Sequence, residues 1–381
     1  MIPPLPAEPR RIVFLFSDTG GGHRSAAEAI IEALDALYEG RISCEMVDFF
    51  KEYAPPPMNL APEIYPPLSR MPALWGMGYR ISDGPRRTRV FYSAIWPYVR
   101  RHIQKLMAEH PAHLYVSVHQ LINTPMARAL AGTGIPLVTV VTDMVTTHAA
   151  WYARGASQVI VPTEEAFRRG LNAGLEPHQM TVVGMPVALR FQRLSEARED
   201  IRRRLGWDER LPVALMVGGG EGMGPLEDMA HAIDEARLPV ALAIVTGRNH
   251  ALRMRLERHP WHIPAHVYGF VTEMPAFMRA ADILISKAGP GTISEAFISG
   301  LPILLYSKMP GQEDGNVTYV VETGAGLWTP TPEELVSALR RWLERPEERQ
   351  HAAQVSRQLA RPDAASEIAR ILGRYAGILQ T

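Results

Sequence analysis

Short apolar runs rich in β-branched residues alternate with stretches of helical spacing along almost the whole chain. A buried strand that is followed by an amphipathic helix, repeated many times, is typical of parallel sheets covered by helices on both faces. We therefore predict an α/β protein with two doubly wound, Rossmann-like parallel sheets. The expected strands are residues 12–16, 42–47, 114–118, 136–142, 158–162, 180–184, 212–218, 239–247, 265–270, 282–286 and 302–306.

The length of 381 residues is too great for one ordinary hydrophobic core, so we expect two domains. The strand–helix pattern breaks at Gly184 and Pro186, which places the seam between residues 1–187 and residues 188–360. Residues 361–381 are expected to form a last helix that can return to the N-terminal domain. Ligands of open α/β sheets bind outside the carboxyl ends of the strands, so two facing sheets predict a binding cleft.

Charge and cysteine content exclude several classes of protein. The 40 Lys and Arg residues balance the 40 Asp and Glu residues, so no global field attracts nucleic acid. Cys44 is the single cysteine, which excludes a disulfide framework and suits a reducing compartment. No apolar run approaches the roughly 18 residues of a membrane span, and the first residues lack the apolar centre of a secretory signal. We expect a cytoplasmic protein that is soluble or bound peripherally to a membrane.

One insertion, residues 53–105, interrupts the alternation. Its first part, residues 53–72, carries seven prolines and is not expected to form a regular helix or a central strand. Aromatic and arginine side chains crowd the part that follows. They are Trp75, Tyr79, Phe91, Tyr92, Trp96 and Tyr98, with Arg80, Arg86, Arg87, Arg89, Arg100 and Arg101. Two interpretations stay open: docking on an anionic membrane surface, or aromatic packing on the N-terminal sheet with arginines in water.

Three glycine-rich turns join an expected strand to an expected helix. Glycine lets another group approach the backbone closely, and helix N-termini attract anions. A simple tight turn explains one such segment, but three in one chain favour phosphate or diphosphate binding. The residues expected to line these turns are Gly20, Gly21, Gly22, Gly219, Gly220, Gly289, Pro290, Gly291 and Thr292.

The pattern does not match the commonest phosphate-binding motifs. The P-loop motif is absent from the sequence, and the dinucleotide fingerprint is met only loosely by Gly20, Gly22 and Ser25. Asp48 ends the second expected strand where a ribose-binding acid would lie, which keeps an NAD-dependent enzyme open. No Asp-x-Asp pair occurs. We therefore expect no metal and no cofactor, with diphosphate charge met by amides, helix dipoles and cations such as Arg248.

Six motifs in series carry a family resemblance: "SDTGGGHRSAAEAI", "VVTDMVTTHAAWY", "GGGEGMGP", "VTGRN", "YGFVTEMPAFMRAADILISKAGPGTISEA" and "PGQEDGN". Over roughly residues 11–330 the chain resembles monogalactosyldiacylglycerol synthases and bacterial diacylglycerol glucosyltransferases. These are relatives of the peptidoglycan N-acetylglucosaminyltransferase and have the GT-B fold. The resemblance implies an inverting, metal-independent transfer of a hexose from a UDP-sugar to 1,2-diacylglycerol. Galactose and glucose remain equally open as the sugar.

The resemblance also implies roles for residues of the C-terminal half. The backbone at Phe270 and Val271 would meet the uracil, and Gly289 to Thr292 would meet the diphosphate. Glu295 would bind the ribose hydroxyls, with a solvated helix residue as the alternative. Three side chains would bind the sugar hydroxyls unless they only form a polar turn: Gln312, Glu313 and Asn316.

The N-terminal half is expected to hold the acceptor and the general base. His23 follows the first glycine turn and titrates near neutrality, so it acts either as the base or as a hydrogen-bond donor to phosphate. Asp143 and His148 are rival bases, and His119 is a fourth candidate on the acceptor side. An enzyme that uses diacylglycerol must reach a lipid in the bilayer. We therefore expect Trp75, Trp96, Arg86, Arg87 and Arg89 to contact an anionic membrane.

Two other functions are compatible with the same residues. One is a UDP-sugar epimerase of a similar two-domain fold, which acts without an acceptor. The other is a non-enzymatic sensor that binds UDP-hexose and reports to a partner protein. For the glycosyltransferase, the expected location is the inner face of the cell membrane, with UDP-hexose, diacylglycerol and the anionic surface as its partners and no nucleic acid.

Overall fold

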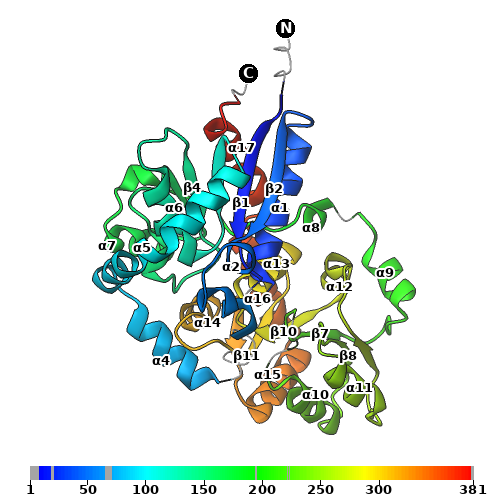
Figure 1. Ribbon diagram of the computed structural model, residues 1–381. Coiled ribbons are helices and arrows are strands. Elements are labelled where there is room, and N and C mark those ends of the chain that lie inside the picture. Colours follow the sequence, from blue (N-terminus) through cyan, green and yellow to red (C-terminus); the bar gives the residue numbers. More distant parts are fainter. Residues whose placement is uncertain are drawn as a thin grey trace. The chain divides into compact units, whose positions relative to one another are not determined.

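The computed structural model describes residues 8–18, 21–64, 71–193, 195–220, 222 and 224–378 (Figure 1). Gly20 of the first glycine turn lies outside the described residues, as do residues 65–70 of the proline-rich segment. The chain divides into two compact units. Unit 1 is Met1–Leu189, Pro310–Gln312 and Asp363–Thr381, and unit 2 is Arg190–Met309 and Glu313–Pro362.

Unit 1 is built on a sheet of six parallel strands in the order β2-β1-β3-β4-β5-β6. The strands are β1 Arg10–Phe16, β2 Ile42–Asp48, β3 Leu114–Ser117, β4 Leu137–Val140, β5 Gln158–Val161 and β6 Met180–Val182. Ile12 of β1 pairs with Cys44 on one side and with Leu114 on the other. The central strands are buried on both faces, which explains why they read as continuous apolar runs rather than as alternating ones.

Helices cover this sheet, and the chain's last helix is one of them. They are α1 Gly22–Leu37, α2 Phe49–Glu52, η1 Met58–Leu60, α4 Pro72–Ser82, α5 Pro85–Glu109, α6 Gln120–Leu130, η2 Ala149–Trp151, α7 Glu164–Ala173, η3 Pro177–Gln179 and α17 Ala364–Tyr375. Figure 1 shows α17, in red, beside α1 and β1. Ile30 and Leu34 of α1 share one core with Ile368 and Leu372 of α17. The end of the chain therefore completes unit 1.

The insertion consists mainly of α4 and α5, each of which has a proline at its start. Its aromatic side chains divide between two environments. Tyr79 and Tyr92 are buried in unit 1, whereas Phe91 and Tyr98 are about half exposed. The expected packing on the N-terminal sheet is confirmed for Tyr79 and Tyr92, and docking of the exposed side chains on a membrane stays a prediction. No helix among the described residues is long and apolar enough to cross a membrane.

Unit 2 has a second sheet of six parallel strands in the order β12-β11-β10-β7-β8-β9. The strands are β7 Val213–Val217, β8 Ala241–Val245, β9 Ala265–Tyr268, β10 Ile283–Lys287, β11 Ile303–Ser307 and β12 Gly326–Trp328. The helices are α8 Arg190–Arg193, α9 Arg198–Leu205, α10 Leu226–Glu235, α11 His250–Arg258, α12 Met274–Ala280, α13 Pro290–Ser299, α14 Asp314–Thr323, α15 Pro332–Glu344 and α16 Pro346–Leu359. The predicted parallel α/β architecture is confirmed. The sequence analysis did not predict β12, α11 or α14.

Each strand order reverses direction at one point, and these points locate the sites. In unit 1 the reversal lies between β1 and β3, and in unit 2 it lies between β7 and β10. At such a point neighbouring loops leave the sheet in opposite directions and open a crevice beyond the strand ends. The candidate ligand-binding segments are therefore those that follow β1, β3 and β4 in unit 1, and those that follow β7 and β10 in unit 2.

We expect Ile368→Ala to destabilise unit 1. The side chain is fully buried between α17 and α1, and truncation of a buried isoleucine costs about 2–5 kcal/mol in the free energy of unfolding. Urea denaturation measures this loss. Arg374→Ala, at an exposed position of the same helix, is the control and should cost less than about 1 kcal/mol. Equal losses in the two variants would contradict the docked position of α17.

Candidate functional site

His23 lies in the first turn of α1, at the reversal point of unit 1. Its Nδ1 atom is 2.9 Å from Oγ1 of Thr142, which follows β4. Its ring centroid is 4.7 Å from that of His119, the N-cap of α6, and 6.2 Å from that of Trp151. Segments that follow three different strands thus bring their polar side chains to one place.

Asp143 follows Thr142 and is almost fully buried. Its Oδ2 atom accepts a hydrogen bond of 2.7 Å from Trp151 Nε1. Its Oδ1 atom accepts one of 2.9 Å from Nε2 of Gln312, which belongs to unit 1. The carboxylate is therefore held through both oxygens. The Gln312 amide, expected at the sugar hydroxyls, donates to Asp143 in this structure, and its contact with the sugar stays a prediction.

Burial sets the charge of the two histidines. It lowers the pKa of His23 to about 4, although a hydrogen bond with the Val118 backbone acts in the opposite direction. Burial also lowers the pKa of His119 well below its usual value, and the neighbouring His23 charge lowers it further. Both rings are accordingly neutral at pH 7. A neutral imidazole can accept a proton, which a general base requires, but cannot neutralise a phosphate.

His148 makes a different set of contacts. Its Nδ1 atom accepts from the Ala150 amide at 3.0 Å, and its Nε2 atom lies 3.2 Å from Ser82 Oγ. Its ring meets the Tyr79 ring edge to face, with centroids 5.1 Å apart. Burial lowers the pKa of His148. The negative charge of Asp83 raises this pKa, and the positive charge of Arg169 lowers it. These contacts attach His148 to the end of α4.

In unit 2 the turn after β7 fits against the turn after β8. The Arg248 amide donates to the Gly220 carbonyl at 2.8 Å. A Cβ atom added to Gly247, whose φ is +61°, would lie 2.4 Å from the Gly220 oxygen and 2.6 Å from the Gly219 oxygen. Only glycine fits there. The Arg248 guanidinium lies over the Phe270 ring, 4.8 Å from its centroid, and Val271 comes next in the chain. These predicted residues therefore share one edge of the sheet.

The turn after β10 leads into α13 and has the features of an anion site. Gly289 is the N-cap of α13 and makes no side-chain cap hydrogen bond. The amides of Gly291 and Thr292, after Pro290, lie in the first turn, where a helix offers no internal acceptor. A Cβ added to Gly291 would have open space around it. Backbone amides, a helix dipole and free access thus coincide at this turn.

Lys287 is a site residue that the sequence analysis missed. A Cβ at Gly219 would lie 3.2 Å from its Cε atom, and one at Gly289 would lie 3.4 Å from its Nζ atom. The Lys287 side chain therefore lies beside both glycine turns of unit 2, with its carbon stem near Gly219 and its amine near Gly289. A cation at the last position of a strand, directly before "AGPGT", was the signal available in the sequence.

Two residues that are predicted to bind the sugar contact Lys287 and the turn between β10 and α13. Lys287 Nζ donates to Glu313 Oε1 at 2.8 Å, and the Met309 amide donates to Glu313 Oε2 at 2.7 Å. Asn316 Nδ2 donates to the Ala288 carbonyl at 2.9 Å. In this structure Glu313 and Asn316 therefore hold the β10–α13 turn, and their contacts with sugar hydroxyls stay predictions.

Glu295 and Gly22 are the remaining residues predicted for the donor. Glu295 is half-buried one turn into α13. Burial raises its pKa to about 7, and the charge of Arg190 opposes the rise. The side chain is therefore partly protonated at neutral pH. Gly22 belongs to unit 1, where it is the first residue of α1 and is exposed.

The residues predicted to meet the membrane lie on α4 and α5. Trp75 and Trp96 are half-buried, and the Arg128 guanidinium lies 5.9 Å from the Trp96 ring centroid. Arg86 and Arg89 are exposed. Arg87 is exposed too, and its Nη1 atom donates to the Arg80 and Asp83 carbonyls.

Asp48 does not have the free carboxylate that a ribose would need. Its Oδ1 atom accepts from the amides of Phe50 and Lys51 at the start of α2, and its Oδ2 atom accepts from the Asp18 amide at 3.1 Å. This argues against the NAD-dependent alternative. The described residues contain no group of three or more His, Cys, Asp or Glu that could hold a metal ion.

Both halves of the chain match one group of enzymes. Residues 23–187 match the family described as monogalactosyldiacylglycerol (MGDG) synthase, and residues 214–368 match the glycosyltransferase family 28 C-terminal domain. The monogalactosyldiacylglycerol synthase of Spinacia oleracea is 37% identical over 375 residues, which are 95% of this chain and 72% of that protein. Synthase 1 of Arabidopsis thaliana is 36% identical over 373 residues, which are 94% of this chain and 70% of that protein.

The chain belongs to the monogalactosyldiacylglycerol synthase family. It is a glycosyltransferase, as the motifs predicted. Both relatives quoted are named chloroplastic. The expected location of this chain at the inner face of a cell membrane therefore stays a prediction.

Solved structures agree with the predicted GT-B fold. MurG of Acinetobacter baumannii has a TM-score of 0.63 at 16% identity, and the match covers 96% of this chain and all of that one. The S. aureus MnaA–UDP structure has a TM-score of 0.65 at 12% identity and covers 97% and 98%. A UDP-N-acetylglucosamine 2-epimerase from Neisseria meningitidis also matches, at 11% identity. Identities this low show the fold alone, so they do not favour an epimerase over the family that the sequence shows.

We expect the pH dependence of stability to report the buried His23. Its pKa is about 4 in the folded protein and about 6.5 when unfolded, so the unfolded chain binds more protons between these values. Stability therefore falls as the pH drops through this window. From pH 7 to 4.5, wild type should lose about 2–3 kcal/mol more than His23→Gln does. Urea denaturation at several pH values measures both. Parallel curves would show that His23 is not held neutral.

Proposed function

We propose that this glycosyltransferase moves galactose from UDP-galactose to the free hydroxyl of 1,2-diacylglycerol, with inversion at the anomeric carbon. The observation that carries the proposal is the 37% identity to a monogalactosyldiacylglycerol synthase over 375 residues, which span both units. Glucose differs from galactose at one hydroxyl and is the alternative sugar that the assay must compare.

Unit 2 provides the donor site in this proposal. The amides of Gly291 and Thr292 and the amine of Lys287 meet the diphosphate. The negative charge that develops on the leaving UDP is then stabilised by fixed dipoles and a cation, which is effective because these groups are already in place. Glu295 accepts from the ribose hydroxyls, and the uracil meets the backbone at Phe270 and Val271. No metal or other cofactor is required, so excess EDTA should leave the rate unchanged.

Unit 1 provides the acceptor site and the base. The acceptor O–H bond breaks as its oxygen forms a bond with the anomeric carbon, and the bond from that carbon to the diphosphate oxygen breaks. His23 takes the released proton, and UDP leaves with the electron pair. Burial leaves the His23 ring neutral at pH 7 and therefore able to accept a proton, although the lowered pKa also makes it a weaker base. A positive charge on the ring is then balanced by the departing diphosphate. Asp143, held by Trp151, remains the rival base.

One assay tests this function against its alternatives. Purified protein is mixed with diacylglycerol in liposomes and either UDP-galactose or UDP-glucose. Release of UDP that requires diacylglycerol, together with a galactolipid product, supports the proposal. Glucolipid as the main product corrects the sugar. Epimerised UDP-sugar without acceptor indicates an epimerase, and binding without turnover indicates a sensor.

Membrane attachment follows from the exposed face of the insertion. Large apolar side chains with about 40–70% exposure lie on α4 and α5 or directly before them: Met71, Leu74, Met77, Ile81, Val90, Phe91 and Tyr98. The exposed Arg86, Arg87 and Arg89 lie on the same segment. Apolar side chains that enter the bilayer interface beside cations that attract anionic headgroups form a peripheral docking surface. Attachment of this kind gives access to a lipid acceptor.

His23→Ala should lower kcat by about a hundred- to ten-thousand-fold, the usual contribution of a general base. The affinity for UDP should stay within about twofold, because unit 2 binds the nucleotide. Initial rates and calorimetry measure the two quantities. A His23→Ala enzyme that keeps more than about a tenth of the turnover, while Asp143→Asn abolishes it, would transfer the role of base to Asp143.

The affinity for UDP should rise with pH near neutrality through Glu295. Its pKa is about 7 without ligand, and the ionised carboxylate is the better acceptor for ribose hydroxyls. From pH 6 to pH 8 the ionised fraction grows about tenfold, and the association constant should follow. Glu295→Gln is the control because glutamine does not titrate. Any pH dependence of UDP binding that remains in this variant comes from UDP itself. Calorimetry at both pH values measures this, and equal pH profiles for both proteins would rule out the ribose role.

The triple variant Arg86→Glu, Arg87→Glu, Arg89→Glu should no longer sediment with liposomes that contain anionic lipid. Each arginine near such a surface contributes about 1 kcal/mol. Wild-type binding should also weaken at high salt, because ions screen the attraction. UDP binding should be unchanged in the triple variant.

The control for this experiment reverses the same number of charges in unit 2, at the exposed Arg237, Arg258 and Arg340. This variant should still bind the liposomes. Binding that is independent of salt and of the three arginines of the insertion would assign docking to another surface.

A further inference from the structure

The end of α4 is attached to the segment 143–149 by several polar contacts. Tyr79 Oη donates to the Thr146 carbonyl at 2.8 Å, and Ser82 Oγ lies 3.2 Å from His148 Nε2. The Ala149 amide donates to Asp83 Oδ1 at 2.8 Å. Because Asp143 begins this segment, α4 is attached to the chain that carries two of the candidate catalytic residues.

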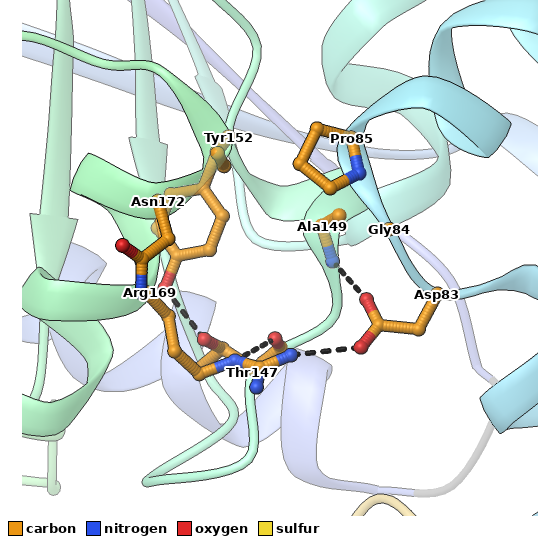
Figure 2. Close-up of a pocket in the computed structure, with 9 residues that line it drawn as sticks. Asp83, Gly84, Pro85, Thr147, Ala149, Tyr152, Arg169 and Asn172 are labelled. Atoms are coloured by element: carbon orange, nitrogen blue, oxygen red, sulfur yellow. Dashed lines mark hydrogen bonds and ion pairs between the residues drawn. The ribbon is translucent and has the colours of Figure 1, made fainter.

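Arg169 of α7 binds both Asp83, at the end of α4, and the backbone of the segment 143–149. Its Nη2 atom donates to Asp83 Oδ2 at 2.8 Å, and its Nε atom donates to the Thr147 carbonyl at 2.7 Å. Figure 2 shows Asp83 reaching Ala149 and Arg169, with Thr147 beside them, at the wall of a small pocket. One guanidinium therefore joins the α4–α5 turn, the segment 143–149 and α7.

The backbone at this junction is constrained as well. Gly84 has a φ of +126°, a conformation that other residues rarely adopt, and Pro85 begins α5 directly after it. Asp83 is therefore held at a sharp corner between two helices. Its carboxylate faces the segment 143–149 and binds it through a backbone amide and, by way of Arg169, through a backbone carbonyl.

Partial exposure decides what the ion pair can contribute. The side chains of Asp83 and Arg169 are 25% and 37% exposed, and pairs with this much solvent access usually contribute little to folding. The pair is therefore a weak source of stability. Both side chains bind the backbone of the segment 143–149. The ion pair can therefore fix the position of that segment.

We propose that Asp83 and Arg169 are positioning residues that hold the segment 143–149 in the place where Asp143 and His148 serve the acceptor reaction. The proposal rests on the function proposed above. In this proposal neither residue contacts a substrate. They act through the backbone of the segment, so the rate of transfer depends on them while donor binding in unit 2 does not.

The test compares Arg169→Met, Arg169→Lys and Asp83→Asn with the matched control Arg168→Met. Arg168 is the preceding residue of α7, and its side chain is 69% exposed. Arg169→Met should lower kcat for hexose transfer about tenfold or more, with UDP affinity within twofold. Arg169→Lys, which keeps the charge and one donor, should recover part of the loss. Asp83→Asn combined with Arg169→Met should be no slower than the slower single variant, because the two residues share one contact.

A second measurement is independent of activity. Hydrogen exchange followed by mass spectrometry should show faster exchange of residues 143–149 in Arg169→Met. Exchange at β3, a central strand of the sheet, should be unchanged, and Arg168→Met should match wild type throughout. A rate above half of wild type in Arg169→Met, or unchanged exchange of residues 143–149, would overturn the positioning role. A wild-type enzyme that transfers no hexose would instead refute the proposed function, while the exchange result would still decide whether Arg169 holds the segment.

Discussion

Parallel strand pairing is the constraint on which both sites depend. In each sheet the described strands all pair in parallel, so the carboxyl ends of the strands within a unit lie along one edge. Segments far apart in the sequence are thereby brought together. His23 and Thr142 meet only because β1, β3 and β4 are neighbours in this order. The helices stabilise each sheet because they bury both faces of its strands.

The two units use this edge in different ways. In unit 2 the described groups are backbone amides, a lysine and an arginine, which suit an anionic ligand that must be held while charge develops on it. In unit 1 the corresponding edge has the half-buried His23, the buried His119 and a carboxylate held by an indole. Burial lowers the pKa of both imidazoles there and leaves them neutral at pH 7. In the proposed mechanism, one fold used twice would separate electrostatic stabilisation from proton transfer.

Sequence reasoning predicted the architecture well because apolar runs and glycine turns are local signals. It missed β12, whose three residues are too few to show a period, and α14, which begins within the polar turn "GQEDGN". It proposed His23, Asp143 and Glu295 from motifs but missed Lys287. Nothing in the sequence indicated that Asp83 and Arg169 bind each other, because 86 positions separate them. Local patterns predict elements, whereas contacts between distant side chains depend on how these elements pack.

Asp48 shows how one strand end can change the use of a common sheet layout. Its carboxylate accepts three backbone amides, two of which begin α2. A carboxylate has about four acceptor positions, so most of its capacity is taken up by the protein's own backbone. The sheet of unit 1 thus keeps the strand order of a nucleotide-binding domain, while the acid at the end of its second strand starts a helix.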